Sequence, residues 1–536
     1  MESNPKNYWL IPLGLAFAMA IGLGLGYFLV PHTDYTHGEQ KGEKYQKIQD
    51  ILEVLDKRYV DDVNGEKLFE ETISDMLHKL DPHSNYIPAK DLKLAQEGIE
   101  GKFGGVGVRF NILRDTICIT NVVKGSPSER AGLLAGDRII SVNGKKTASA
   151  KITNQKVMEF LKGKEGTKVK VEIQRGKDKK TFSVTRGGIP ITSVTSAFMM
   201  NQSVGYIRIE QFSVPTHDEF RYAAESLLQQ GMTKLILDLR YNPGGVLSAA
   251  IDISDEFLPG GMTIVETRGI NQRDEKYKSR SGGLLERIET AVLINQNSAS
   301  ASEIVAGALQ DNDRATIYGR RSFGKGLVQG DFNLRDGSNL RLTVARYYTP
   351  SGRCIQKEYN GSMEDYYADS RDRYDNGELF APDSTLFGDS LKYRTRKGRI
   401  VYGGGGIMPD VFIPLDTLDY TGYFNQLRFS GAVQAFAFDF VNGKRKQWPS
   451  LKNFSTTFQV GNDLSRKFAK YAADDFAVPF SSQELSKSHN SISRTLKAEI
   501  ARQIWLENGY FYITNQTDNE VQVVLKNMVK KGEQRF

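Results

Sequence analysis

The chain has 536 residues, of which 39% are hydrophobic and 25% charged, a composition typical of folded globular proteins. Its 71 Lys and Arg residues exceed its 64 Asp and Glu residues by only seven, without a concentrated basic patch, so no nucleic-acid partner is predicted. Two cysteines exclude a disulfide framework, and the absence of zinc-ligand spacing excludes a Cys-based metal site.

Residues 8–30 form an uncharged, mostly apolar run that is long enough to cross about 30 Å of hydrocarbon as a helix. A cleaved signal peptide is the alternative, because Ala18-Met19-Ala20 resembles a cleavage site. Apolar sequence continues to Val30, however, where the apolar region of a signal peptide would already have ended. We therefore expect an uncleaved membrane anchor within residues 1–35.

The charges that flank this run predict its orientation. Lys6 precedes it, whereas Asp34 and Glu39 follow it, so the positive-inside rule places the body of the protein outside the cytoplasm. An extracytoplasmic body without evident disulfides suits a bacterial periplasm, with the anchor in the inner membrane.

The next two regions differ in their apolar periodicity. Residues 36–98 are predicted to be helical, with two amphipathic helices that separate near Asn64-Gly65. Within this region His83 is interpreted as a capping or packing residue. Residues 99–187 are predicted to form a β-rich module with one helix at Asn154–Leu161. Its predicted strands are Ile117–Val123, Ile139–Val142, Val169–Ile173 and Phe182–Val184.

Residues 188–415 alternate short, continuous apolar runs with helical segments, which predicts an α/β domain with buried strands. The predicted strands include Lys234–Leu239 and Ala291–Asn295, and the predicted helices include Thr216–Gln230 and Ser300–Leu309. Residues 357–400 are rich in Tyr, Asp and Arg and are interpreted as an inserted surface segment. Residues 416–536 are predicted to be a helical C-terminal extension, with helices at Leu496–Asn508 and Glu520–Val529.

The segment Asn297–Glu303 (NSASASE) lies between a predicted buried strand and a predicted helix. A serine at such a junction lies beside backbone N–H groups that the helix leaves unpaired, and these groups can bind a developing oxyanion. Ser300-x-x-Glu303 also fits a capping box, and most such patterns mark only the start of a helix. Spacing alone does not choose among Ser298, Ser300 and Ser302 as a nucleophile.

The segment Gly319–Gly326 (GRRSFGKG) superficially fits a phosphate-binding loop, but Gly326 stands where Ser or Thr would bind magnesium, so an ATPase is disfavoured. Lys325 lies between two glycines, where a tightly packed backbone can bury its amine. A buried lysine loses proton affinity and can act as a general base. The alternatives are a solvated loop lysine and a histidine base from a distant part of the sequence.

Several stretches together resemble the active-site signature of the carboxy-terminal processing proteases, also called tail-specific proteases. These stretches are residues 295–329, Asp238–Gly245, Leu342–Gln356 and Gly405–Asp410. Phe103–Val108 and Ala131–Gly144 resemble parts of a PDZ domain. The resemblance covers roughly residues 40–415 and implies a mixed α/β core, similar to crotonase and Clp peptidase, with an inserted PDZ domain. It implies no metal or organic cofactor.

The resemblance also assigns roles within the site. It makes Ser300 the nucleophile, Lys325 the base and Gln329 the residue that orients the lysine. The backbone N–H of Ala301, with one from the Gly244-Gly245 turn, would form the oxyanion hole, since glycines allow the backbone angles that aim an N–H group into a site.

In the PDZ module the resemblance implies a loop that captures the terminal carboxylate of a peptide. This loop is Phe103-Gly104-Gly105-Val106-Gly107. Where the family often has an arginine that couples the position of the PDZ domain to activity, the chain has Lys162, which keeps the charge but lacks the planar fork. Lys162 is therefore a candidate coupling residue.

The sequence thus predicts a membrane-anchored, extracytoplasmic serine endopeptidase that recognises the C-terminal tails of proteins and cleaves through an acyl-enzyme. The alternative is a catalytically silent PDZ scaffold on a protease-like body. A homodimer through the helical ends is also predicted, because residues such as Ile500, Ile504, Trp505 and Tyr510–Tyr512 form apolar faces. Cys118 and Cys354 are expected to be small buried residues.

Overall fold

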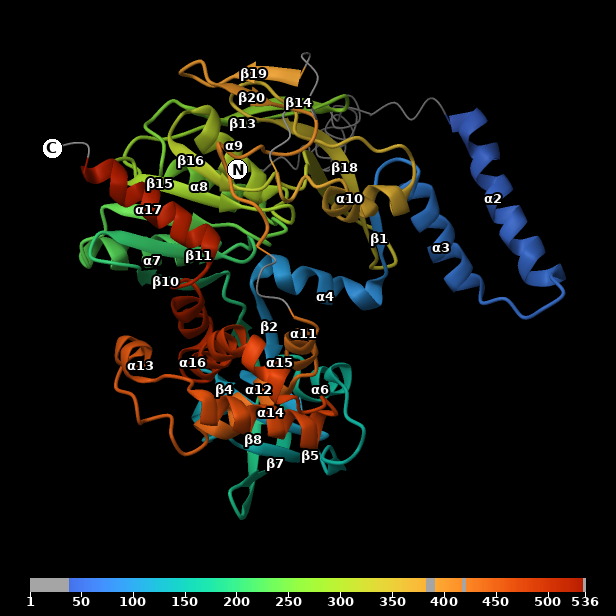
Figure 1. Ribbon diagram of the computed structural model, residues 1–536. Coiled ribbons are helices and arrows are strands. Elements are labelled where there is room, and N and C mark those ends of the chain that lie inside the picture. Colours follow the sequence, from blue (N-terminus) through green and yellow to red (C-terminus); the bar gives the residue numbers. More distant parts are fainter. Residues whose placement is uncertain (1–37, 382–390, 417–420, 534–536) are drawn as a thin grey trace, which may run out of the picture. The chain divides into compact units, whose positions relative to one another are not determined.

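The computed structural model describes residues 38–381, 391–416 and 421–533, and the chain divides into two compact units at Asp75/Met76 (Figure 1). The first unit contains helix α2 (Gly38–Arg58) and most of α3 (Gly65–His78), so the predicted break near Asn64-Gly65 is confirmed. The predicted anchor at residues 8–30 lies outside the described residues. Within the described ranges, no helix is both long enough and apolar enough to cross a membrane.

Within the second unit, an antiparallel sheet forms the core of the module that was predicted to be β-rich. Its strand order is β3-β4-β5-β7-β8, and β6 pairs with β5. On β7 the side chains of Val169, Val171 and Ile173 are fully buried, because alternate residues of a strand face the same side of the sheet. The elements are β3 (Val108–Leu113), β4 (Thr116–Val122), α5 (Pro127–Ala131), β5 (Arg138–Val142), β6 (Lys145–Lys146), α6 (Asn154–Leu161), β7 (Lys168–Arg175) and β8 (Asp178–Thr185).

A mostly parallel sheet forms the centre of the α/β domain, in the order β10-β11-β12-β15-β16-β21. Only the β10–β11 pair is antiparallel within this sheet. The strands are β10 (Val194–Met199), β11 (Val204–Ile209), β12 (Lys234–Asp238), β15 (Glu289–Ile294), β16 (Ala315–Gly319) and β21 (Val411–Phe412). Because the central strands are covered on both faces, β12 and β15 appear in the sequence as the continuous apolar runs from which they were predicted.

Helices cover both faces of this sheet. On one face lie α7 (Thr216–Gln229), α8 (Leu247–Asp255) and α9 (Ala301–Asp311), which share a large apolar core with the strands. On the other face α17 (Asn519–Glu533) packs Val521, Val524 and Met528 against strand residues that include Ile236 and Leu293 (Figure 1).

A second sheet lies beside this core and has the order β1-β18-β13-β14, with β17 paired to β18. Its strands are β1 (Asn85–Ile87), β13 (Thr263–Gly269), β14 (Gln272–Lys278), β17 (Leu327–Asn333) and β18 (Asn339–Tyr348). Strand β2 (Lys102–Gly105) precedes the sheet of the β-rich module in the chain and β9 (Gly187–Pro190) follows it, and the two strands pair with each other. Helix α4 (Ala89–Glu100) precedes β2.

The segment that was interpreted as a surface insertion contains α10 (Met363–Asp375), β19 (Lys392–Arg394) and β20 (Ile400–Tyr402). The interpretation is wrong for one side of α10, where Tyr366 and Arg373 are buried. Arg373 donates to the carbonyl of Ser322 at 2.9 Å, so α10 packs against the loop that carries Lys325.

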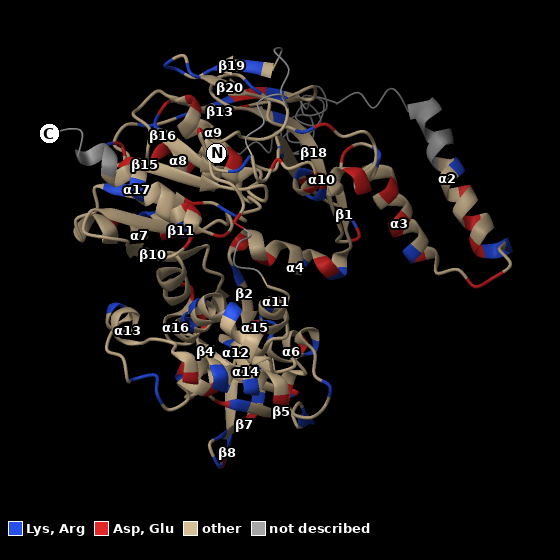
Figure 2. Ribbon diagram, in the orientation of Figure 1, with Lys and Arg blue, Asp and Glu red and all other residues tan. Residues whose placement is uncertain are grey.

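The predicted helical C-terminal extension contains seven helices within its described residues. They are α11 (Gly422–Phe429), α12 (Ala432–Val441), α13 (Leu451–Thr457), α14 (Asn462–Phe476), α15 (Ser482–Lys487), α16 (His489–Thr514) and α17. The first six share one apolar core, which includes Ile500, Ile504 and Trp505. The apolar faces that suggested self-association at this end therefore pack within a single chain. Lys and Arg residues are spread along the described chain, with Asp and Glu residues between them (Figure 2).

Candidate active site

Ser300 lies at the junction between β15 and α9, as predicted, and its φ of 55° places it in the left-handed region that a non-glycine residue rarely adopts. Its two neighbouring serines are occupied elsewhere. The Ser298 hydroxyl donates to the carbonyl of Leu239 at 2.8 Å, and the Ser302 hydroxyl donates to the carbonyl of Asn242 at 3.0 Å. Both of these side chains are fully buried, whereas Ser300 lines a cavity. The geometry therefore singles out Ser300 among the three serines.

A cavity of about 390 Å³ brings the predicted site residues together. Its lining includes Ser300, Ala301, Lys325, Gln329, Gly244 and Gly245. Burial lowers the pKa of the Lys325 amine, and the positive charge of Arg341 lowers it further, while Glu303 and Asp81 oppose the shift. No hydrogen bond joins the Ser300 hydroxyl to the Lys325 amine in the part of the chain that the structure describes.

Glu303 connects the two segments that carry Ser300 and Lys325. Its fully buried carboxylate accepts the N–H of Ser300 at 2.8 Å and the N–H of Lys325 at 2.9 Å. It also accepts the N–H of Gly324 at 2.7 Å and the hydroxyl of Ser322 at 2.6 Å. Desolvation nevertheless raises the pKa of Glu303 to about 7. One side chain thus fixes the backbone on both sides of the candidate site.

Tyr347 makes a second connection between the same segments. Its hydroxyl lies 2.6 Å from the carbonyl of Lys325 and 3.1 Å from the carbonyl of Ser300. Sequence reasoning missed this residue, because a tyrosine in a strand gives no signal of such a contact. Glu303 was noticed only as part of a capping box, and its reach to the lysine loop has no local sequence signal.

Gln329 lies on β17 and lines the cavity, but its side-chain nitrogen is buried without a hydrogen-bond partner among the described residues. The structure therefore does not place it in a bond to Lys325, the role that the resemblance implies. The Gln329 amide therefore lies in the cavity that contains Ser300 and Lys325, but it forms no hydrogen bond to the lysine.

The turn at Gly244-Gly245 lies directly against Ser300. A Cβ atom added to Gly244 would lie 2.7 Å from Ser300 Cβ and 2.9 Å from the nitrogen of Ala301, so only glycine fits there. The N–H of Gly244 donates to the side chain of Asn242 at 2.8 Å and is therefore not free to bind an oxyanion. Of the two N–H groups in this turn, that of Gly245 therefore remains as a candidate donor beside that of Ala301.

The predicted carboxylate loop of the β-rich module is only partly a loop. Phe103, Gly104 and Gly105 belong to β2, where Gly104 and Gly105 pair with Gly188 and Gly187 of β9. Val106 and Gly107 follow this strand, and Gly107 has a φ of 82°. The prediction of a loop is therefore wrong for Phe103–Gly105, which pair with β9, and only Val106 and Gly107 form the turn into β3.

Lys162 lies at the end of α6 and forms an ion pair with Glu97 of α4. Its amine also lies 4.5 Å from the centre of the Phe103 ring. Ile99, two residues beyond Glu97, lines the cavity that contains Ser300. The candidate coupling residue is thus connected to the candidate active site through one helix.

His83 packs near the same site, in line with its interpretation as a packing residue. Its side-chain nitrogen lies 3.0 Å from the Tyr366 hydroxyl, and its backbone N–H donates to Asp81 at 2.8 Å. Burial and the nearby Lys325 charge lower the pKa of His83 to about 3, so the imidazole is neutral at physiological pH. Cys118 is fully buried, as expected, whereas Cys354 is half-buried.

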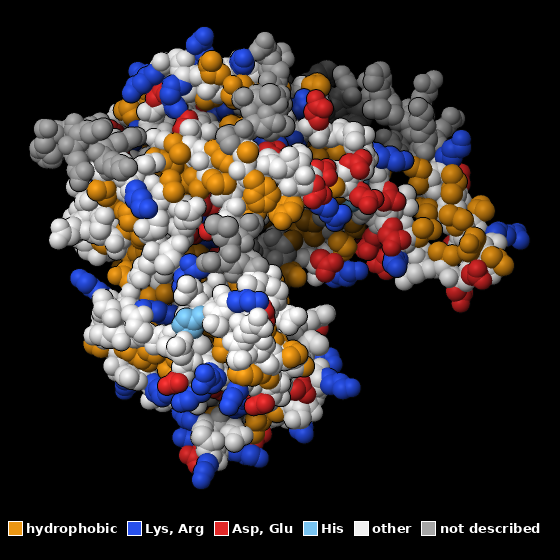
Figure 3. Space-filling view, in the orientation of Figure 1, with side chains coloured by type: hydrophobic (Ala, Val, Ile, Leu, Met, Phe, Trp, Pro, Cys, Tyr) orange, Lys and Arg blue, Asp and Glu red, His pale blue; other side chains and the backbone are white. Residues whose placement is uncertain are grey.

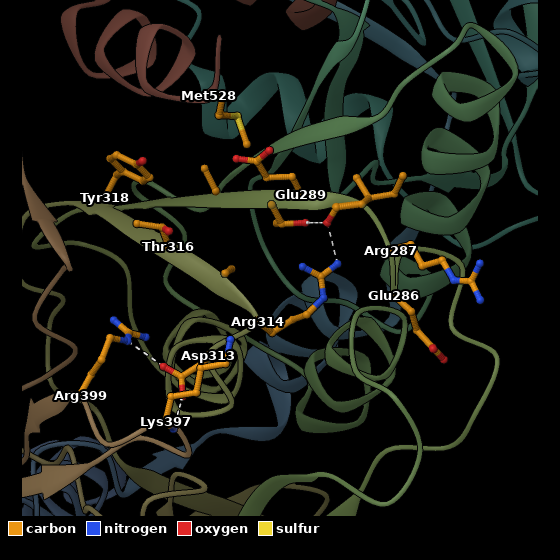
Figure 4. Close-up of a pocket in the computed structure, with 14 residues that line it drawn as sticks. Glu286, Arg287, Glu289, Asp313, Arg314, Thr316, Tyr318, Lys397, Arg399 and Met528 are labelled. Carbon is orange, nitrogen blue, oxygen red and sulfur yellow. Dashed lines mark hydrogen bonds and ion pairs between the residues drawn. The ribbon is translucent and has the colours of Figure 1, made fainter. Parts of the chain in front are cut away.

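A larger cavity, of about 700 Å³, lies elsewhere on the central sheet (Figure 4). Its lining includes Glu289 and Thr316, near the amino ends of β15 and β16, whereas Ser300 follows the carboxyl end of β15. Several of its charged groups are already paired: Arg399 donates to Asp313 at 2.7 Å, and Arg314 donates to the carbonyl of Ile288 at 2.6 Å. The size of this cavity therefore does not make it the better candidate site.

Comparisons with known proteins identify the parts of the chain. Residues 203–367 match Peptidase family S41, and residues 104–185 match the PDZ domain. Residues 30–91 match the activating protease CtpB N-terminal domain, and residues 423–506 match a family of unknown function.

Named relatives agree with these matches. The carboxy-terminal-processing protease of Bartonella bacilliformis is 38% identical over 348 residues, which cover 63% of this chain and 79% of the relative. A probable CtpA-like serine protease of Staphylococcus aureus is 35% identical over 316 residues, which cover 58% of this chain and 62% of the relative. The solved photosystem II D1 C-terminal processing protease has 27% identity and a TM-score of 0.34, over 57% of this chain and 89% of that chain. This chain therefore belongs to the carboxy-terminal-processing proteases, serine proteases of peptidase family S41 that carry a PDZ domain.

Proposed function

We propose that this chain is a membrane-anchored endopeptidase of the bacterial periplasm that cleaves tail-bearing protein substrates with a Ser300/Lys325 dyad. One observation carries the proposal: Ser300 and Lys325 line the same cavity, and burial lowers the pKa of the lysine. A neutral amine can accept a proton, whereas an ammonium group at that position could not act as a base.

In the proposed reaction the Ser300 hydroxyl passes its proton to the Lys325 amine as its oxygen attacks a peptide carbonyl. The N–H groups of Ala301 and Gly245 stabilise the oxyanion of the tetrahedral intermediate. The lysine then protonates the leaving amine, and an acyl ester remains on Ser300. Lys325 then removes a proton from water as the water oxygen attacks the ester carbonyl. The bond between the acyl group and the Ser300 oxygen breaks, and the proton passes from Lys325 to that oxygen, which restores both side chains.

Two surfaces support the proposed substrate class. The cavity beside Ser300 is lined by Val246, Leu247 and Ile304, which suit a small apolar side chain next to the cleaved bond. In the PDZ domain β3 lies at the edge of its sheet and can pair with an added peptide strand. A tail held along β3 would fix the substrate while Ser300 attacks another part of it.

We also propose a homodimer, with α2 as its contact surface. Ile48, Ile51 and Val54 follow one another at helical spacing and are 50%, 53% and 59% exposed. Figure 3 shows hydrophobic side chains along this helix. A second copy of α2 would cover them, and light scattering of residues 36–536 should report a dimer. A monomer would contradict this part of the proposal.

The dyad is tested with a peptide that has an apolar free C-terminus and with four variants of the chain. Ser300→Ala and Lys325→Ala should abolish cleavage, and Lys325→Arg should do the same, because arginine keeps the charge but cannot be deprotonated. Ser302→Ala is the matched control: its hydroxyl faces away from the cavity, so it should lose about 1 kcal/mol of stability and keep its activity.

Undiminished cleavage by Ser300→Ala or Lys325→Arg would refute the dyad. A wild-type chain that binds the peptide without cleaving it would instead support the silent PDZ scaffold. The proposed anchor is tested in cells: the full chain should sediment with membranes and be accessible to protease added to the periplasm. A chain that lacks residues 1–35 should be released, and retention of this shortened chain in the membrane fraction would count against the anchor.

A further inference from the structure

Helix α17 begins at a largely buried cluster of charged side chains. Two arginines from different loops meet two acidic residues at the start of this helix. Arg240 lies 3.0 Å from Asp518 and 3.4 Å from Glu520, and Arg320 lies 2.8 Å from Glu520. The side chains of Arg240 and Arg320 are only 7% and 1% exposed.

Each arginine belongs to a loop that carries part of the candidate site. Arg240 stands in the segment Asp238–Gly245, which ends at the turn against Ser300. Arg320 stands five residues before Lys325, in the loop that follows β16. A displacement of either guanidinium group would therefore move an oxyanion donor or the base.

Glu520 is the group that both loops share. Asp238, which is fully buried, provides a further partner for Arg240 at 2.7 Å. Within the described residues Arg320 pairs with no other carboxylate; it also donates to the carbonyl of Ile413 and to the Gln296 side chain, both at 3.2 Å. Because a buried charge that loses its partner is strongly unfavourable, Arg320 depends on Glu520 more than Arg240 does.

The helix that presents these acids is itself held at both ends. Asp518 accepts the N–H of Val521 at 3.0 Å and so caps the first turn of α17. Near the other end, Lys234 of β12 donates to the carbonyl of Met528 and lies 3.3 Å from Glu289. The apolar side of the helix packs on the central sheet between these ends. The acidic residues are therefore rigidly placed.

We propose that Asp518 and Glu520 are positioning residues for the active site, which hold Arg240 and Arg320 and thereby fix the oxyanion turn and the Lys325 loop around Ser300. The inference rests on the proposed roles of Ser300 and Lys325. It gives α17 a role in the reaction although none of its residues lines the Ser300 cavity.

The test compares Glu520→Gln, Asp518→Asn and the double variant with Lys526→Gln, which removes an exposed charge from the same helix. Glu520→Gln should lower kcat by at least about 10-fold while KM changes by less than about 3-fold, because small misplacements of reacting groups are costly and the edge strand β3 of the PDZ domain is untouched. Glu520→Asp, which keeps a carboxylate, should lower kcat less than Glu520→Gln does. Lys526→Gln should have the kcat and KM of the wild type.

Hydrogen exchange supplies a readout that does not depend on activity. Amides of residues 239–245 and 319–326 should exchange at least about 10-fold faster in Glu520→Gln, while those of α9 stay protected. Unchanged exchange in both loops of the double variant would overturn the inference. Full cleavage by Ser300→Ala would instead overturn the proposed function, so the two failures are distinguishable. If the double variant does not fold, Asp518→Asn decides, since this side chain is 26% exposed and its loss should still speed exchange in residues 239–245.

Discussion

Replacement of Glu303 by Gln should change how the stability of the protease depends on pH. The Glu303 carboxylate is fully buried and accepts four hydrogen bonds, all from donors on the two segments that flank the site. Burial favours its neutral form and the four donors favour its charged form, and the pKa of about 7 shows that burial prevails. Glutamine has a similar size but cannot titrate.

The magnitude follows from proton linkage. Glu303 has a pKa of about 7 in the folded chain and its usual 4.5 in the unfolded chain, so the folded chain binds more protons between these pH values. The free energy of unfolding therefore falls as pH rises through this window. A difference of 2.5 pH units, at about 1.36 kcal/mol each, corresponds to about 3 kcal/mol. Glu303→Gln should lack this contribution.

Urea unfolding followed by circular dichroism at pH 5, 6, 7 and 8 measures the effect. At pH 5 the variant should be less stable than the wild type by about 1–3 kcal/mol, because the protonated carboxyl still has two oxygens that can accept hydrogen bonds, whereas the glutamine NH₂ group accepts none. The two stability curves should converge as pH rises, since only the wild type loses stability by ionising this group. Parallel curves would refute the reasoning. Cleavage should fall by about 100-fold at every pH, because the backbone of Ser300 and Lys325 is no longer held by one acceptor.

Three further predictions concern the same site. The cleavage efficiency, kcat/KM, should fall as the pH drops through the lowered pKa of Lys325. Arg341→Gln should shift this fall to higher pH, because the variant removes a positive charge that lowers the pKa of the lysine. An unchanged pH profile would show that Arg341 does not influence the base. Lys325→Met should abolish cleavage yet raise the free energy of unfolding at pH 7 by about 1 kcal/mol, because the wild-type chain buries an amine that is more favourably solvated by water. Urea unfolding measures this difference, and a variant less stable than the wild type would contradict the prediction. Lys162→Gln should reduce cleavage of a peptide with a free C-terminal tail several-fold without weakening the binding of that peptide to the PDZ domain. Replacement of the exposed Lys164 by Gln should change neither cleavage nor binding. Equal effects of the two variants would argue against coupling through Glu97.

The spacing of apolar residues predicted those elements whose buried side is evident from neighbouring residues in the sequence. The helix Asn154–Leu161 was predicted at its observed bounds, because its apolar residues follow helical spacing and Thr153 caps its first turn. The buried side of α10 was missed for the opposite reason. Arg373 is 2% exposed and forms a local ion pair with Asp369, one turn earlier on α10, at 3.0 Å. Its guanidinium group also donates to the carbonyls of Arg321 and Ser322, which are 52 and 51 residues away in the chain, and no local pattern signals these contacts.

The candidate site was predictable to a similar extent. The family resemblance selected Ser300 and Lys325, and the structure places both on one cavity. The sequence could not show that Asn242 occupies the N–H of Gly244, because a turn glycine shows nothing of the direction in which its amide points. Nor could it show that Gln329 stands unengaged, since a side-chain amide has several rotamers within reach of the same backbone position.

The backbone contacts of Lys325 determine how the dyad can engage. Its N–H is bound by Glu303 and its carbonyl by Tyr347, and each of these side chains also holds the backbone of Ser300. The loop is therefore fixed to the nucleophile at both ends of the lysine residue, and only the lysine side chain is left to turn toward the serine hydroxyl. Such a rotation is a rotamer change, which is faster by orders of magnitude than refolding of a loop. Any control of this protease by a bound tail should consequently act on what surrounds the amine, such as Gln329 and Ile99, rather than on the path of the loop.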